Sequence, residues 1–176
     1  MLFENKVELV TASDAGYSAE LIATLTRVLA EWTAPDFLTA VAAREGVDLD
    51  PGAITMVTML SREGPQRPSQ LATNMVTGAS NISKITARLT AAGLARRVQD
   101  PRDARAQLLE LTRSGEQVAA ALVRAGTGLV DDLLNGWDDT DRTDLARLLK
   151  KFEGSTIALA DGLGHTAKNF IHKNNQ

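Results

Sequence analysis

The stretch from residue 67 to residue 112 constrains the fold of this 176-residue chain most strongly, because its local pattern changes several times within it. A short helix is predicted over about 68–75, since Pro68 suits a first helical position. A second helix is predicted over about 79–92 and ends at Gly93, as expected of a C-terminal glycine. The few residues between the two helices leave room only for a tight turn.

The second of these helices has two distinct faces. Ile82, Ile85 and Leu89 repeat at intervals of three and four residues, so they are predicted to face the core. The opposite face is small and hydrogen-bonding at its start and basic further along; it carries Ser80, Asn81, Ser83, Lys84, Ala87 and Arg88. Such a face can enter the major groove of DNA, about 12 Å wide, and offer donors and acceptors to base edges.

A two-stranded hairpin with a basic tip is predicted after this helix. Residues 94–98 and 107–111 have the pattern of paired strands, and Asp100-Pro101-Arg102-Asp103 supplies the turn. Arg102 and Arg105 project from the region of that turn.

Several residues of this stretch follow the pattern of one known family: Leu71-Ala72, Ile82, Ile85, Leu89, Gly93-Leu94, Arg97, the run Asp100–Arg105, Leu111-Thr112 and Gly115. The chain resembles the MarR family of winged helix-turn-helix transcription regulators over about residues 50–115. The resemblance implies that Arg105 reaches from the wing into the DNA minor groove and that Asp103 orients it. A narrow minor groove has an enhanced negative potential, which favours an inserted guanidinium.

The resemblance and the residue types together give a predicted DNA-binding surface. It comprises Arg67, Ser69, Thr77, Gly78, Ala79, Ser80, Asn81, Ser83, Lys84, Arg88, Arg97, Arg102, Asp103 and Arg105. Lys84 is suited to a base or to a phosphate. Arg88 is better explained by a salt bridge or by solvent than by a contact that reads the DNA sequence. Arg67 stands where the family usually has Ser or Thr; it cannot cap the helix, so a phosphate contact is open to it. Thr77 and Gly78 both remain candidates to cap the second helix.

Charge is distributed unevenly along the chain. Residues 62–113 hold nine Lys or Arg against four Asp or Glu, a balance of +5, and the remaining residues have a balance of −8. The net charge of −3 alone would argue against nucleic acid, but a basic segment within an acidic chain suits a duplex-binding module.

Helices are predicted on both sides of this module. The apolar stripes predict helices over about 18–32 and 35–45, a helix over 51–63 capped by Asp50, a long helix over 112–134 capped by Thr112, and a helix from 140 or 141 to about 160 followed by a loose tail. Residues 1–17 lack clear periodicity.

The predicted fold is therefore mainly α with a small β-hairpin wing. Dimerisation arms at 1–49 and 113–176 flank a winged helix-turn-helix module at 50–112. The stripes of the arms expose more apolar surface than one small domain can cover, so a two-fold homodimer is expected.

Outside the predicted DNA-binding surface, the sequence offers few candidates for other sites. The resemblance implies a pocket for a small aromatic or lipophilic effector, and Trp32, Phe37, Met56 and Met59 are candidates to line it. Methionine or aromatic residues at helical spacing are far more often plain core. With two His and no Cys, neither a metal site nor a cofactor is expected, and no catalytic motif is visible. No apolar run approaches the roughly 20 residues of a membrane span, so a cytoplasmic protein is expected.

The sequence thus predicts a homodimeric repressor that binds double-stranded DNA at an inverted repeat. The alternative is a winged-helix protein that acts through protein association and has no specific DNA target.

Overall fold

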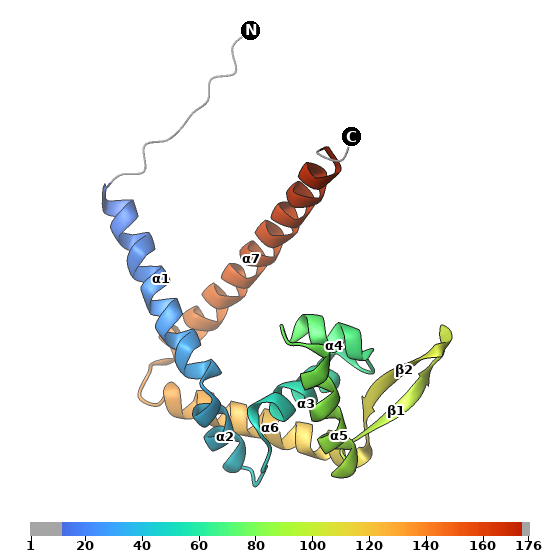
Figure 1. The fold of residues 1–176 in the computed structure, drawn as a ribbon. Coiled ribbons are helices and arrows are strands. Elements are labelled where there is room, and N and C mark those ends of the chain that lie inside the picture. Colours follow the sequence, from blue (N-terminus) through green and yellow to red (C-terminus); the bar gives the residue numbers. More distant parts are fainter. Residues whose placement is uncertain (1–11, 174–176) are drawn as a thin grey trace. The chain divides into compact units, whose positions relative to one another are not determined.

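The computed structural model describes residues 12–173, and this part of the chain contains seven helices and one two-stranded sheet (Figure 1). In chain order the elements are α1 (Ala12–Thr33), α2 (Pro35–Ala43), α3 (Pro51–Glu63), α4 (Pro68–Asn74), α5 (Ala79–Ala91), β1 (Ala95–Asp100), β2 (Asp103–Leu111), α6 (Arg113–Leu133) and α7 (Asp139–Lys173). The expected fold class, mainly helical with a hairpin wing, is confirmed.

The chain divides into two compact units, and the boundary between them in the sequence lies between Leu129 and Val130. The first contains α1 to α5, the hairpin and most of α6; the second contains the end of α6 and α7. The divisions expected after residues 49 and 112 separate the dimerisation arms from the DNA-binding module by function and not by compactness. They stay predictions.

Two predicted helix starts are confirmed in atomic detail. The Asp50 carboxylate accepts hydrogen bonds from the backbone N–H groups of Gly52 at 3.1 Å and Ala53 at 3.2 Å, at the start of α3. The Thr112 hydroxyl accepts from the N–H of Gly115 at 3.1 Å, at the start of α6. Each side chain satisfies amides that have no partner within their own helix.

The core of the first unit lies among α3, α4, α5, α6 and the hairpin. Its largest fully buried side chains are Met56, Val57, Leu71, Ile82, Ile85, Leu89 and Leu109. Gly115 packs so closely that a Cβ atom there would lie 2.0 Å from the carbonyl oxygen of Leu94. This glycine is therefore required for the start of α6 to approach the short segment between α5 and β1.

The hairpin extends further than the sequence predicted. β1 pairs with β2 in antiparallel register from Ala95 opposite Leu111 to Asp100 opposite Asp103, so only Pro101 and Arg102 lie outside the strands. The predicted strands ended early because the polar residues near the tip carry no apolar alternation. At the base, Gln66 bridges to Leu109 through hydrogen bonds of 3.0 and 2.8 Å, which holds the segment before α4 beside β2.

The terminal helices are also longer than predicted. α1 begins at Ala12 rather than Ser18, and α7 runs to Lys173 rather than ending near Ala160. The loose tail predicted after residue 160 is wrong for residues 161–173, which are helical, because Gly162 and Gly164 each cost a helix only about 1 kcal/mol relative to Ala. Residues 174–176 of that tail lie outside the described part of the chain. No proline interrupts residues 139–173. Of the irregular start expected over 1–17, residues 1–11 lie outside the described part of the chain.

Candidate nucleic-acid interface

The α5 helix presents the two faces that its sequence predicts. Ile82, Ile85 and Leu89 are buried in the core, and Thr86 is buried with them. The residues of the opposite face are all exposed: Ser80, Asn81, Ser83, Lys84, Ala87 and Arg88. This face is therefore accessible to a partner, and two of its side chains, Asn81 and Arg88, also make contacts within the protein.

The turn before α5 settles which residue caps the helix. Gly78 occupies the N-cap position and, having no side chain, makes no side-chain cap. Thr77 instead accepts a hydrogen bond from the Asn81 side-chain amide at 3.1 Å. Val76 precedes them with a φ of +48°, in the left-handed region, and is 92% exposed. The N-cap residue of α5 therefore provides no side-chain acceptor for the first backbone amides of the helix.

Two adjacent arginines on β1 differ in their surroundings. Arg96 lies opposite Glu110 in the register and forms a 2.7 Å ion pair with it. Arg97 is exposed on the other face of the strand, and no side-chain partner is recorded for it among the described residues. This alternation places Arg97 on the face that remains available to a ligand.

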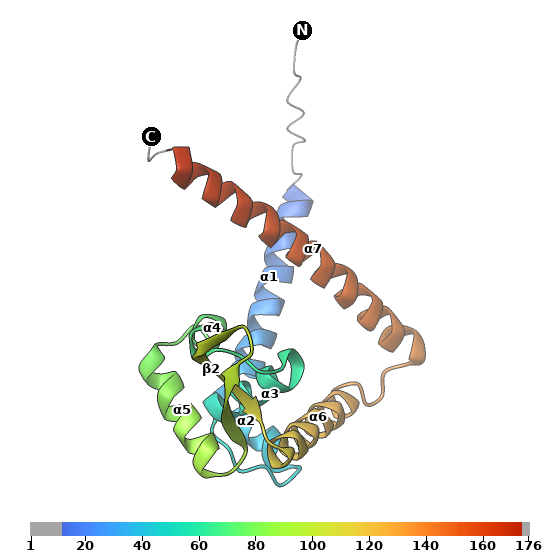
Figure 2. The same ribbon diagram turned by 90° about the vertical axis from the view of Figure 1, so that its right-hand side faces the viewer.

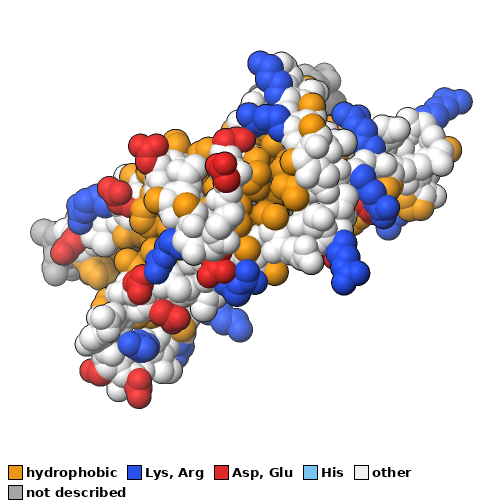
Figure 3. Space-filling view, turned by 90° about the horizontal axis from the view of Figure 1, so that it is seen from below, with side chains coloured by type: hydrophobic (Ala, Val, Ile, Leu, Met, Phe, Trp, Pro, Cys, Tyr) orange, Lys and Arg blue, Asp and Glu red, His pale blue; other side chains and the backbone are white. Residues whose placement is uncertain are grey.

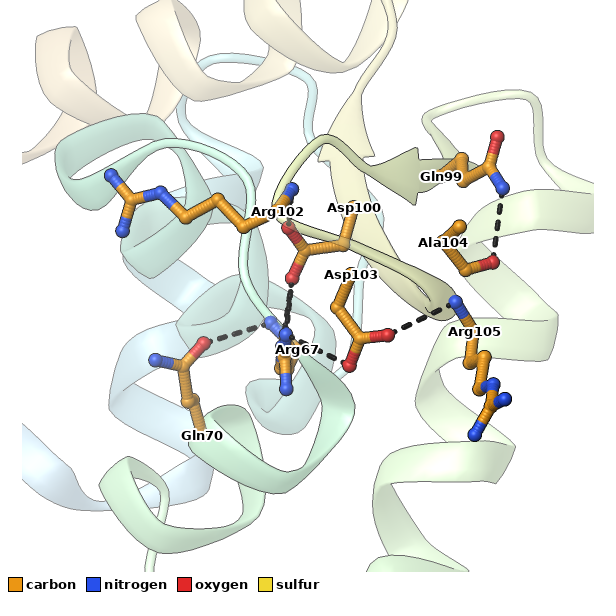
Figure 4. A network of polar contacts seen from close by, with 8 residues as sticks. All are labelled: Arg67, Gln70, Gln99, Asp100, Arg102, Asp103, Ala104 and Arg105. Carbon is orange, nitrogen blue, oxygen red and sulfur yellow. Dashed lines mark hydrogen bonds and ion pairs between the residues drawn. The ribbon is translucent and has the colours of Figure 1, made fainter.

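The tip of the hairpin is held by a wing clamp formed by Arg67, Asp100 and Asp103 (Figure 4). The Arg67 Nη2 atom lies 2.7 Å from Asp100 Oδ2 and 3.5 Å from Asp103 Oδ2, and Nε donates to Asp100 Oδ2 at 2.8 Å. The other oxygen of each carboxylate accepts from the backbone: Asp100 Oδ1 from Arg102 at 2.9 Å, and Asp103 Oδ1 from Arg105 at 3.1 Å. The clamp therefore joins the start of α4 to the wing.

The Asp100 carboxyl is the titratable group most affected by this arrangement. The hydrogen bond from the Arg102 backbone, then that from the Arg67 side chain, lower its pKa below the ordinary value against the opposing effect of desolvation. Because the pKa in the folded state lies below the unfolded value, the carboxylate stabilises the fold at neutral pH. That contribution is lost as the pH falls through the folded-state pKa.

The wing arginines themselves point away from the clamp. Figure 4 shows the guanidinium groups of Arg102 and Arg105 directed away from the two carboxylates. Asp103 thus contacts the backbone amide of Arg105, not its guanidinium. Lysine and arginine side chains gather over the part of the first unit that holds α5 and the hairpin (Figure 3).

Two other predicted DNA contacts are engaged within the protein. Arg88 forms a 2.9 Å ion pair with Asp50, the residue that caps α3. Arg67 is engaged in the wing clamp rather than free for a phosphate. Ser69 and Ala79 are exposed. Asp100 was not among the residues predicted for the site, although its place at the start of the turn Asp100-Pro101-Arg102-Asp103 was a local signal for it.

The predicted effector residues are not gathered in one place. Met56 is 0% exposed, a core residue on the inward face of α3, so its assignment to a pocket is corrected. Met59 lines a hollow of about 240 Å³ together with Leu38, Ile54, Thr55, Thr58, Arg62 and Glu63. Trp32 and Phe37 are not among the residues that line this hollow.

Within the described residues, no group of three or more His, Cys, Asp or Glu is placed to hold a metal ion. None of the helices in that part of the chain combines the length and apolarity needed to cross a membrane. The side chains of His165 and His172 lie outside the described part.

The sequence of the winged module is similar to those of known transcriptional regulators. Residues 49–106 match the sequence profile of the MarR family. The chain is 26% identical over 110 residues to the uncharacterized HTH-type transcriptional regulator YxaD of Bacillus subtilis (strain 168), covering 62% of this chain and 77% of that protein.

Solved structures show the same fold at low identity. A MarR family protein from Bacillus stearothermophilus superposes with a TM-score of 0.68 at 19% identity, covering 81% of this chain and 96% of that one. The apo form of wild-type MarR from E. coli gives a TM-score of 0.61 at 18% identity, with 76% and 94% covered.

Proposed function

Because this chain belongs to the MarR family of winged helix-turn-helix transcription regulators, we propose that it is a homodimeric repressor that binds an inverted-repeat DNA operator. As a regulator of this family, it is not an enzyme. The proposal extends the family assignment to the mode of DNA binding, the oligomeric state and the sign of regulation.

The observation that carries the proposal is the exposed polar face of α5 beside a hairpin with unpaired arginines. Ser80, Asn81 and Lys84 are exposed on α5 and suit contacts to base edges in the major groove. Arg102 and Arg105 are exposed on the wing and suit an adjacent minor groove, whose negative potential attracts guanidinium groups. The local balance of +5 over residues 62–113 favours the approach of a polyanion.

The dimer is proposed from the apolar faces of the terminal helices. Large apolar side chains remain exposed on α1 and α7, including Ile22, Leu29, Trp32, Leu148, Leu149, Phe152, Ile157, Leu159 and Leu163. A second copy of the chain would cover such faces and place two recognition helices about 34 Å apart, one turn of DNA.

A small aromatic or lipophilic effector is proposed to release the DNA. It would do so only by binding more tightly to a dimer whose recognition helices no longer match the operator. The hollow lined by Met59 is the described cavity that best fits the predicted effector site. We place the protein in the cytoplasm, where a repressor of bacterial type meets its operator.

Selection of bound duplexes from a random pool, at about physiological salt, tests the proposal directly. The expected result is an enriched inverted repeat with half-sites one turn apart. If a folded dimeric protein enriches no sequence, the specific-operator proposal is wrong.

The wing contact is tested by replacing Arg105 with Ala. Loss of a guanidinium from a narrow minor groove should weaken operator binding by roughly ten- to a hundredfold in a fluorescence anisotropy titration. Arg96→Ala is the matched control, because it removes the same charge from the same hairpin but from a side chain already paired with Glu110. Equal affinities for Arg105→Ala and wild type would exclude the minor-groove role.

The alternative function, protein association without a DNA target, makes a different prediction about salt. Binding through several phosphate contacts must weaken steeply as salt rises. A flat salt dependence, or no binding to any duplex, favours the alternative.

A further inference from the structure

The residue at the start of α4 is unusual for a helix N-cap, and its side chain has another use. The Arg67 side chain makes no cap hydrogen bond. Its backbone N–H is instead satisfied by the Gln70 side-chain oxygen at 3.0 Å. The preceding residue, Gln66, is hydrogen-bonded to Leu109 of β2. Backbone pairing thus fixes Arg67 beside the hairpin. Because the Arg67 side chain takes no part in capping the helix, it can extend to the tip of the hairpin.

The contacts of that guanidinium follow a repeated pattern. In both Asp100 and Asp103, one oxygen faces Arg67 and the other accepts a backbone N–H of the wing. The amides reached in this way are those of Arg102 and Arg105, the two arginines whose side chains leave the tip. Each carboxylate therefore links the Arg67 guanidinium to the backbone amide of one wing arginine (Figure 4).

Burial makes these contacts consequential. The Asp100 side chain is only 8% exposed, so its negative charge depends on the partners it has within the protein. Arg67 is half-buried, and its guanidinium contacts the Asp100 carboxylate directly, whereas the Arg102 side chain acts on it only through its charge.

We infer that Arg67 is a positioning residue of the wing: through Asp100 and Asp103 it fixes the backbone at Arg102 and Arg105 and so sets the direction in which both side chains leave the tip. The sequence left a phosphate contact open to Arg67, and the positioning role is an alternative to that contact. Its consequence for DNA affinity rests on the proposed function, whereas its consequence for the hairpin does not.

The hairpin part is tested on the free protein with Arg67→Ala. Carbon-detected NMR titration should show the pKa of the Asp100 carboxyl rising toward its ordinary value, because a guanidinium that favours the ionised form is gone. Hydrogen exchange of the Arg102 and Arg105 amides should become faster. The Gly115 amide, bonded to the Thr112 hydroxyl, should keep its rate and so report an intact module.

Arg113→Ala is the matched control for this measurement. It removes one exposed arginine at the start of α6, outside the wing clamp, and should alter neither the titration nor the two wing amides. An unchanged Asp100 titration together with unchanged exchange at Arg102 and Arg105 in Arg67→Ala would overturn the inference.

The DNA part is tested by a double-mutant cycle of Arg67→Ala and Arg105→Ala on a selected duplex. If Arg67 acts through Arg105, the double variant should lose at least about threefold less affinity than the product of the single losses. Losses that multiply to within about twofold would mean that Arg67 contacts DNA independently, which contradicts the positioning role. If no duplex binds at all, the proposed function fails, and the amide and titration results still decide whether Arg67 positions the wing.

Discussion

Apolar residues recur at similar spacing in the winged module and in the terminal helices, but they are buried in the module and exposed on the terminal helices. In the module, Met56, Leu71, Leu89 and Leu109 are almost completely removed from solvent. In α1 and α7, large apolar side chains at helical spacing remain exposed in the single chain. Short helices and a hairpin that approach from several directions enclose a core, whereas the stripe of one long helix needs a second surface to cover it.

This difference indicates what each region requires in order to be stable. The module is complete within one chain, so its stability should depend on internal fit and not on protein concentration. The terminal helices leave apolar surface in water, and each large side chain that becomes buried contributes about 1.5–3 kcal/mol. Association should therefore act through the terminal helices.

The largest effect is expected from Gly115→Ala, where the start of α6 packs against the module. The added Cβ would lie 2.0 Å from the Leu94 carbonyl oxygen, and rigid backbone cannot give way as a flexible side chain does. We expect a loss of at least about 3 kcal/mol in the free energy of unfolding, measured by urea denaturation.

Gly126→Ala is the matched control in the same helix, because nothing in the chain lies within 4 Å of the added Cβ. A gain of about 0.5–1 kcal/mol is expected there, since alanine favours a helix more than glycine. A large loss of unfolding free energy in Gly126→Ala, or no loss in Gly115→Ala, would contradict the distinction between the packed start of α6 and its open part.

A change in oligomeric state is expected from Phe152→Glu on α7. A charge within the apolar stripe should weaken a dimer by about a hundredfold, as at an interface hot spot, and leave unfolding of the module unchanged. Sedimentation equilibrium over a range of concentrations measures the dissociation constant.

Ala158 lies on another face of α7 than the apolar stripe, because successive residues of a helix are turned by about 100°. Ala158→Glu therefore adds the same charge outside the stripe and should leave the dimer intact. If Phe152→Glu is as dimeric as Ala158→Glu, the α7 stripe is not the association surface.

The smallest effect is expected at Val76, an exposed apolar residue within the otherwise closed module. A β-branched residue at a φ of +48° is strained, and at 92% exposure it has little packing to lose. Val76→Gly should therefore raise the free energy of unfolding by about 0.5–1 kcal/mol, visible as a higher Tm. A lower Tm would show that Val76 is covered in solution.

Much of the candidate interface followed from patterns that act over a few residues. The exposed and buried faces of α5 follow from the helical repeat, as Ile82 and Ser83 illustrate. The starts of α3 and α6 follow from Asp50 and Thr112, because a cap acts on amides two or three positions away. The position of the hairpin turn followed from Asp100-Pro101-Arg102-Asp103 in the same way.

Tertiary structure alone decided which of the polar residues act on one another. Arg67 and Asp100 are 33 positions apart, and Arg88 and Asp50 meet only because α5 packs against α3. No local pattern distinguishes a guanidinium that is free for DNA from one held by a carboxylate. Met56 and Met59 likewise share a helix and a residue type, yet one lies in the core and the other lines a hollow, because their directions from α3 meet different neighbours.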